Sequence, residues 1–343
     1  MRTFSDLRGE QRREADLPLF DAPATVRTFD TPEFRDITFY EVEAKSILNR
    51  VPAASRFGFE WTINVYRGCS HACRYCFARP SHTYLNMGAG EDFERKIVVK
   101  VNAPEVLRRE LRKRSWRGAH VAMGTNTDPY QRAEGRYRLT RGVLEVLRDY
   151  ANPCSVLTKS PLLLRDLDLF TELVSTAGFS ANLSIGTFDE DVWRRTEPGT
   201  PHPRARMQAV EALNRAGVPT GVLVAPVLPE ISDSPSQLKE VVRAAAEAGA
   251  SHVSPITLHL RPGVKEEFMP WLEREYPELV GDYRRMYRGS NAPKATREAI
   301  AVRVGAAKRR YPPPEPAPEP PNPRRLVPPT LPPAEQGDQL SLL

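Results

Sequence analysis

The chain contains 343 residues, of which 40% are hydrophobic and 27% charged, enough to bury one large core or two small ones. No apolar run approaches the roughly 18 residues that a membrane span requires, and four cysteines without an apolar signal region exclude a disulfide framework. We therefore expect a cytoplasmic protein with no membrane partner, whose formal net charge of +6 permits an anionic partner without requiring one.

Residues 1–45 carry few apolar periodicities, and we expect them to form a partly disordered N-terminal arm. From Ser46 onward, a pattern of a strand followed by a helix repeats. The expected strands are short, rich in Val, Ile or Leu and non-alternating, as strands buried on both faces are. They span residues 61–66, 120–124, 154–158, 180–185, 220–225 and 252–256, and the helices between them span residues 103–114, 140–150, 164–176, 203–216 and 234–248.

Six β/α units in series predict a parallel sheet with its helices outside, because right-handed crossovers return each helix to the same face of the sheet. We expect an α/β fold, a partial (β/α)6 barrel of the TIM type over residues 46–275, followed by a helical extension over residues 276–310. Functional residues of such barrels gather at the carboxyl ends of the strands.

Three cysteines form a C-x3-C-x2-C run, Cys69, Cys73 and Cys76, after the first expected strand. Three thiolates on one short loop can hold three irons of a [4Fe-4S] cluster and leave the fourth iron without a protein ligand, open to a small molecule. An open iron indicates catalysis rather than a purely structural site.

Zinc is the alternative occupant of these thiolates, because His71 or His82 could complete a tetrahedral Cys3His site. Structural zinc sites usually take their ligands as two separated pairs, whereas this chain carries one compact triplet. With zinc, the protein would be a non-catalytic nucleic-acid-binding adaptor.

The cysteine spacing, with the aromatic Tyr75 before the third cysteine, resembles the signature of the radical S-adenosylmethionine (SAM) superfamily. The resemblance implies a [4Fe-4S] cluster whose open iron chelates SAM, and it places Tyr75 at the bound SAM. It also implies an electron donor such as flavodoxin or ferredoxin. In that superfamily one electron from the cluster cleaves SAM to a 5'-deoxyadenosyl radical, so the difficult chemistry belongs to the cofactor.

Gly124, Thr125 and Asn126 follow the second expected strand. Radical SAM enzymes place there a loop that binds the amino group of SAM, so the resemblance assigns these three residues to the cofactor. An ordinary turn set by Asp128 and Pro129 is the alternative.

Lys159 and Ser184 lie at the ends of the third and fourth expected strands. A lysine at the end of a buried strand is poorly placed unless it meets an anion, and the SAM carboxylate is such an anion. We assign both residues to SAM. Glu197 and Arg206 are further candidates, for the ribose and the carboxylate.

Four segments, residues 69–76, 124–131, 158–160 and 196–200, together resemble the spore photoproduct lyase-like group of the superfamily. The resemblance implies a lyase-like reaction on a nucleic-acid-related substrate, DNA or RNA, in repair or modification. That lyase splits a thymine dimer and uses a cysteine and tyrosines to return a hydrogen, but the spare cysteine of this chain, Cys154, lies some 16 Å from Lys159 along the strand. A small metabolite or a peptide is the alternative substrate.

Beyond Arg310 the sequence becomes proline-rich, and we expect residues 311–343 to form an extended, disordered tail. The tail ends in five residues, Gln339 to Leu343, that resemble the short motif by which bacterial replication and repair proteins bind the sliding clamp. A terminus without function is the alternative.

Overall fold

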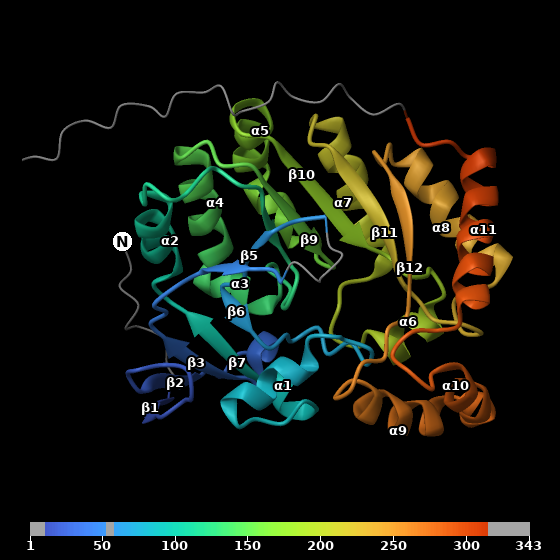
Figure 1. Ribbon diagram of the computed structural model, residues 1–343, viewed down its shortest axis with the longest axis horizontal. Helices are drawn as coiled ribbons and strands as arrows, with labels where there is room; N and C mark the ends of the chain where they lie inside the picture. The colour runs from blue at the N-terminus through green and yellow to red at the C-terminus, as the bar shows by residue number, and fades with distance from the viewer. Residues whose placement is uncertain (1–10, 53–57, 315–343) are drawn as a thin grey trace, which may run out of the picture.

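The computed structural model describes residues 11–52 and 58–314, and its centre is a seven-stranded sheet (Figure 1). Six strands of this sheet run parallel in chain order, and β4 pairs antiparallel at one edge. The parallel strands are β5 (Trp61–Ile63), β8 (Val121–Met123), β9 (Cys154–Thr158), β10 (Phe179–Ser184), β11 (Thr220–Val227) and β12 (Val253–Thr257), and β4 spans Leu48–Arg50. The prediction of a partial barrel with six β/α units is confirmed.

Helices cover the outer face of this sheet, as the right-handed crossovers require (Figure 1). They are α2 (Ala103–Leu111), α4 (Leu139–Asp149), α5 (Leu167–Thr176), α7 (Pro203–Arg215) and α8 (Pro235–Glu247). Two short helices, α3 (Arg132–Tyr137) and α6 (Glu190–Thr196), belong to the segments that follow β8 and β10. The five predicted helices are confirmed to within a few residues, except that α5 is preceded by a 3-10 turn over Pro161–Asp166.

The two faces of the barrel strands differ in burial, contrary to the prediction that both are buried. Outward residues such as Val156, Ala181 and Val222 lie in the main core together with the helices. Their neighbours Ser155 and Asn182 are only partly buried. The inner face is therefore partly open, because the barrel does not close and no helix covers that side.

A second sheet of five strands lies beside the barrel, at the lower left in Figure 1. Its strands in spatial order are β1 (Gln11–Ala15), β2 (Ala24–Thr28), β3 (Thr38–Val42), β7 (Lys96–Lys100) and β6 (Tyr66–Arg67). This corrects the predicted N-terminal arm, because residues 11–42 supply three of these strands. β1, β2 and β3 pair locally and antiparallel, but their sequences carry few apolar residues. This local unit joins the rest of the fold through long-range pairing, because β3 runs parallel to β7.

The predicted strand over residues 61–66 is divided between the two sheets. Its first half is β5, in the barrel, and its end is β6, which pairs antiparallel with β7. The cysteine run follows β6, so it emerges between the barrel and the second sheet.

Three helices follow the last barrel strand, within and beyond the range predicted as a helical extension. They are α9 (Lys265–Glu275), α10 (Val280–Met286) and α11 (Lys294–Arg310). The last of them packs on α8 and β12 and covers the outer face of the final strand. The sliding-clamp motif and most of the predicted tail lie outside the described residues. Within the part of the chain that the structure describes, no helix is long and apolar enough to cross a membrane.

Candidate active site

The cysteine run forms a loop between β6 and a 3-10 helix over Arg79–Leu85, at the carboxyl ends of the parallel strands. We call these strand ends the mouth of the barrel. Cys69 and Cys73 are buried, Cys76 is partly exposed, and all three are free thiols. The Cys73 thiol makes only a long contact, 3.9 Å, to the carbonyl of His71. The loop thus presents three sulfur atoms that no disulfide occupies.

The segment that follows β8 fixes the start of this loop. Thr127 Oγ1 and Gln131 Nε2 donate to the carbonyl of Gly68 at 2.6 and 3.0 Å, and the backbone N–H of Ser70 donates to Gln131 Oε1 at 3.0 Å. Gln131 is fully buried. The chain after β8 therefore fixes the position of Cys69.

The segment between α6 and α7 contacts the middle of the loop. Gly199 N–H donates to the carbonyl of His71 at 3.1 Å, and Arg74 N–H donates to the carbonyl of Thr196 at 2.9 Å. A side chain at Gly199 would overlap the backbone carbonyl of Ser70, so only glycine allows this approach.

Arg79, which could not be recognised from the sequence as a site residue, stabilises the backbone of the cysteine loop through hydrogen bonds. Its Nε and Nη2 donate to the carbonyl of Cys73 at 3.1 and 2.9 Å, and its Nη1 donates to the carbonyls of Ala89 and Gly90 at 3.0 Å. It also pairs with Glu94 and is almost completely buried. A buried guanidinium with every donor engaged is a rigid support for a neighbouring backbone.

Glu197 joins the loop to the barrel through a buried ionic cluster. The Tyr75 hydroxyl donates to its Oε1, Lys159 Nζ lies 3.2 Å from Oε1, and Arg206 Nη2 donates to Oε2 at 2.6 Å. Burial alone would raise the pKa of Glu197, but Arg206 and then Lys159 outweigh it and lower the pKa to about 2. Glu197 is therefore a carboxylate at neutral pH.

Arg206 was a candidate for binding the SAM carboxylate, but each nitrogen of its guanidinium donates to a group within the protein. Its remaining donors bond to the carbonyls of Ser184 and Pro201 at 3.0 and 2.9 Å and to the hydroxyl of Thr200. Its side chain has no exposed surface. The structure places Arg206 and Glu197 behind the mouth, as supports for the site.

Lys159 and Ser184, predicted at neighbouring strand ends, lie together. Lys159 Nζ donates to Ser184 Oγ at 2.7 Å and to the carbonyl of Ala225 at 3.1 Å, and it lies 5.6 Å from the centre of the Tyr75 ring. Parallel neighbours bring these residues together, since β10 lies between β9 and β11.

Gly124, Thr125 and Asn126 form the turn after β8 and are each partly exposed. The φ angle of Gly124 is +92°, and a Cβ there would overlap the carbonyl of Leu157 on β9. Asn126 N–H donates to Asn64 Oδ1 at 3.1 Å, which ties this turn to the end of β5. The turn therefore exposes backbone and small polar groups at the mouth.

The two histidines considered as zinc ligands are engaged elsewhere. His71 Nδ1 lies 3.3 Å from Asp128 Oδ2, and His82 Nε2 lies 2.8 Å from the carbonyl of Lys96. Within residues 11–52 and 58–314, no three His, Cys, Asp or Glu side chains are arranged to hold a single metal ion.

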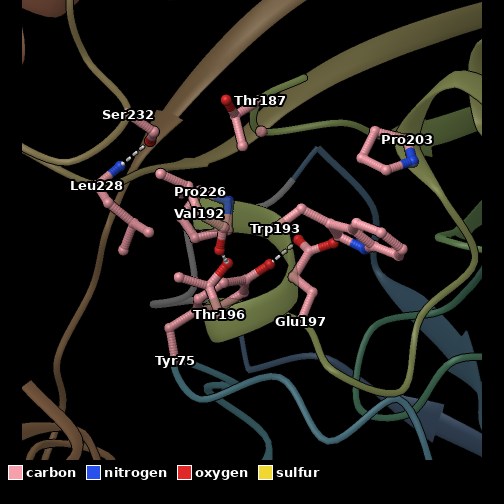
Figure 2. A pocket seen from close by; sticks show the side chains of 11 residues that line it. Tyr75, Thr187, Val192, Trp193, Thr196, Glu197, Pro203, Pro226, Leu228 and Ser232 are labelled. Carbon is pink, nitrogen blue, oxygen red and sulfur yellow. Dashed lines mark hydrogen bonds between the residues drawn. The ribbon is translucent and has the colours of Figure 1, made fainter. Parts of the chain in front are cut away.

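A small pocket opens beside Tyr75, between the segments that follow β10 and β11 (Figure 2). Figure 2 shows Tyr75 and Glu197 on one side, Trp193 and Thr196 of α6 next to them, and Leu228 opposite. Its lining is mixed, with apolar and hydroxyl side chains: Tyr75, Gly186, Thr187, Val192, Trp193, Thr196, Glu197, Pro203, Pro226, Leu228 and Ser232.

Cys154, the spare cysteine, lies at the start of β9, at the opposite end of the strand from Lys159. It is 1% exposed and belongs to the main apolar core. Burial raises the pKa of its thiol. Cys154 is a buried apolar residue remote from the site.

Comparison with known sequences identifies a family and several relatives. The model of the radical SAM superfamily matches residues 63–245. An uncharacterized protein of Mycobacterium tuberculosis is 47% identical over 296 residues, which cover 86% of this chain and 87% of that protein. An uncharacterized protein of Methanocaldococcus jannaschii is 29% identical over 251 residues, covering 71% and 85% of the two chains.

Among solved structures, spore photoproduct lyase complexed with dinucleoside spore photoproduct is similar, with a TM-score of 0.57 and 16% identity over 80% of each chain. A variant of that lyase with bound AdoMet and the same dinucleoside aligns with a TM-score of 0.56 and 16% identity over 78% of this chain and 77% of that one. At this identity the likeness shows a shared fold. The family match covers more than half of the chain, and the chain therefore belongs to the radical SAM superfamily of enzymes, whose cofactors are a [4Fe-4S] cluster and SAM.

Proposed function

We propose that Cys69, Cys73 and Cys76 hold the [4Fe-4S] cluster and that the enzyme acts on a nucleic-acid-related substrate, in a lyase-like reaction of DNA repair or modification. The assignment of the cluster rests on one observation: three free thiols lie on one loop, held by hydrogen bonds, at the mouth of six parallel strands. When bound, the cluster supplies the electron with which this family cleaves SAM.

The surroundings of the thiols fit an anionic cluster. Burial raises the pKa of Cys73 and Cys76, so the free thiols are neutral, and metal binding must remove their protons. The carboxylate of Glu197 adds to this effect at Cys73, whereas the charge of Lys159 lowers the pKa of both thiols. Arg206 does so at Cys73, and Arg79 does so at Cys76. These cations favour the thiolate forms that iron requires.

The mouth offers groups of the right chemistry for SAM. Lys159 carries a positive charge for the carboxylate, and it lies beside Ser184, whose hydroxyl accepts from Lys159 and donates to the carbonyl of Ala225. The turn over Gly124, Thr125 and Asn126 offers backbone groups to the amino end. The small pocket beside Tyr75 has a partly apolar lining and borders Glu197, next to these groups.

The nucleic-acid part of the proposal rests on the fold shared with spore photoproduct lyase and on the net charge of +6. Since Cys154 is buried away from the site, it cannot serve as the thiol that returns a hydrogen in that lyase. A different hydrogen donor, or a different bond, distinguishes this enzyme. The free thiols and the absence of a membrane-spanning helix among the described residues agree with work in the cytoplasm beside a flavodoxin or a ferredoxin.

Replacing Cys73 by Ala should abolish both the cluster and SAM cleavage, because two thiolates cannot hold three irons. The protein reconstituted without oxygen should contain about four irons and four sulfides per chain and form 5'-deoxyadenosine when reduced. Cys154→Ala is the matched control and should keep both. Full cleavage by Cys73→Ala, or one zinc in place of iron in the original protein, would refute the cluster assignment.

Replacing Lys159 by Ala should leave the iron content unchanged and weaken SAM binding by about tenfold or more. A lost charge-assisted contact costs about 1.5–3 kcal/mol. Glu197 keeps Arg206 as its partner in this variant, so the loop should remain in place. Equilibrium binding of SAM measures the effect, and Lys239→Ala, on the exposed face of α8, is the control. Unchanged SAM affinity would show that Lys159 only supports Glu197.

We further propose that residues 339–343 bind the bacterial sliding clamp. Leu340, Leu342 and Leu343 are hydrophobic residues at the end of a proline-rich segment. A labelled peptide of residues 334–343 should bind the clamp with micromolar affinity, about −8 kcal/mol, by fluorescence anisotropy. Replacing Leu340 and Leu342 by Ala should remove this binding. If the unmodified peptide showed no saturable binding at tens of micromolar, the proposal that residues 339–343 bind the sliding clamp would be wrong.

A further inference from the structure

Arg261 lies four residues beyond β12, at the mouth of the barrel. Its Nε atom is buried and has no hydrogen-bond partner. Its side chain forms no ion pair or hydrogen bond with any residue in the ranges 11–52 and 58–314. This buried Nε–H is costly, because it has lost water without gaining an acceptor.

The other cations of the site have partners within the protein, and one of them, Lys159, is the residue proposed to meet the carboxylate of SAM. Lys159 and Arg206 share Glu197, and Arg79 is bonded to Glu94 and to three carbonyls. Arg261 differs from these cations, because its buried Nε–H has no partner in the described part of the chain. Its donors are available to an anion that the protein itself does not supply.

The backbone holds Arg261 in place. Leu260 N–H donates to the carbonyl of Ser290 at 2.8 Å, and Val264 N–H donates to the carbonyl of Arg261 at 3.0 Å. A Cβ on Gly263 would lie 2.6 Å from Pro80 Cγ, so this turn touches the helix that follows the cysteine loop. The position of Arg261 is thus fixed before any ligand arrives.

Arg261 also lies next to the cysteine loop. Leu260 and Val264, on either side of it, belong to the same apolar cluster as Cys73 and Tyr75. An anion bound by Arg261 would therefore be held beside the reactive centre.

Two large apolar side chains are exposed on the cysteine loop and near the end of β12. Phe77, directly after Cys76, is 46% exposed, and Ile256 on β12 is 49% exposed. Large apolar side chains at a mouth of this kind can contact the face of a base, while a guanidinium can bind a phosphate through paired hydrogen bonds. A nucleotide unit carries both features, whereas a simple inorganic anion carries one.

We propose that Arg261 binds a backbone phosphate of a nucleic-acid substrate and so positions one nucleotide against the cysteine loop. This proposal rests on the proposed function and adds the residue that recognises the substrate class. The carboxylate of SAM is the competing anion, and the experiment separates the two.

The full-length protein with its cluster reconstituted is titrated with a fluorescein-labelled single-stranded oligothymidylate at several salt concentrations. Arg261→Ala should weaken binding by about tenfold and lower the slope of log affinity against log salt by about 0.7, the share of one phosphate contact. Arg261→Lys keeps the charge and should keep the slope. Iron content, SAM affinity and 5'-deoxyadenosine formation without substrate should be unchanged in both variants.

Arg215→Ala is the matched control, because Arg215 ends α7 at the opposite end of the barrel and is exposed. It should bind the oligonucleotide like the original protein. Equal binding by Arg261→Ala and Arg215→Ala, or no binding by the original protein, would overturn the phosphate site while leaving SAM cleavage intact. Weaker SAM binding by Arg261→Ala with unchanged oligonucleotide binding would also overturn it and assign the arginine to SAM.

Discussion

The carboxylate of Glu197 is the interaction on which the site depends. It is buried, it is ionised, and it receives Tyr75 from the cysteine loop, Lys159 from the end of β9 and Arg206 from α7. A buried charge is tolerated only when its partners are in place, and removing one partner of such a pair typically costs about 3–5 kcal/mol. Glu197 therefore fixes the loop to the barrel, in addition to the hydrogen bonds that the loop makes with Thr127, Gln131 and Gly199.

This constraint acts together with Arg79 to organise the mouth of the barrel. Arg79 holds the carbonyl of Cys73 from below, while Glu197 holds Tyr75, two residues further along. The three sulfur atoms of the loop make few hydrogen bonds of their own. The polar network thus fixes the backbone of the loop and leaves the thiols available as iron ligands. A cluster site needs such surrounding groups to orient its ligands.

The local pattern of the sequence was sufficient for the barrel and for the cysteine loop. Short apolar strands followed by amphipathic helices predict parallel order, and parallel order brings Lys159 and Ser184 together. The second sheet was missed because β3 pairs with β7, more than fifty residues later, and no local signal records that pairing. The roles of Arg79, Arg206 and Arg261 could not be predicted either, because an arginine in a sequence does not reveal whether carbonyls, a carboxylate or nothing will meet it after folding.

The central claim is that three thiolates on this braced loop leave one iron open and that SAM occupies it. Mössbauer spectroscopy of protein reconstituted with isotopically enriched iron tests this most directly, with spectra recorded before and after SAM is added. The account predicts that the signal of one iron of the four shifts when SAM binds while the other three stay unchanged. Spectra that are identical with and without saturating SAM, in protein with a full cluster, would contradict it.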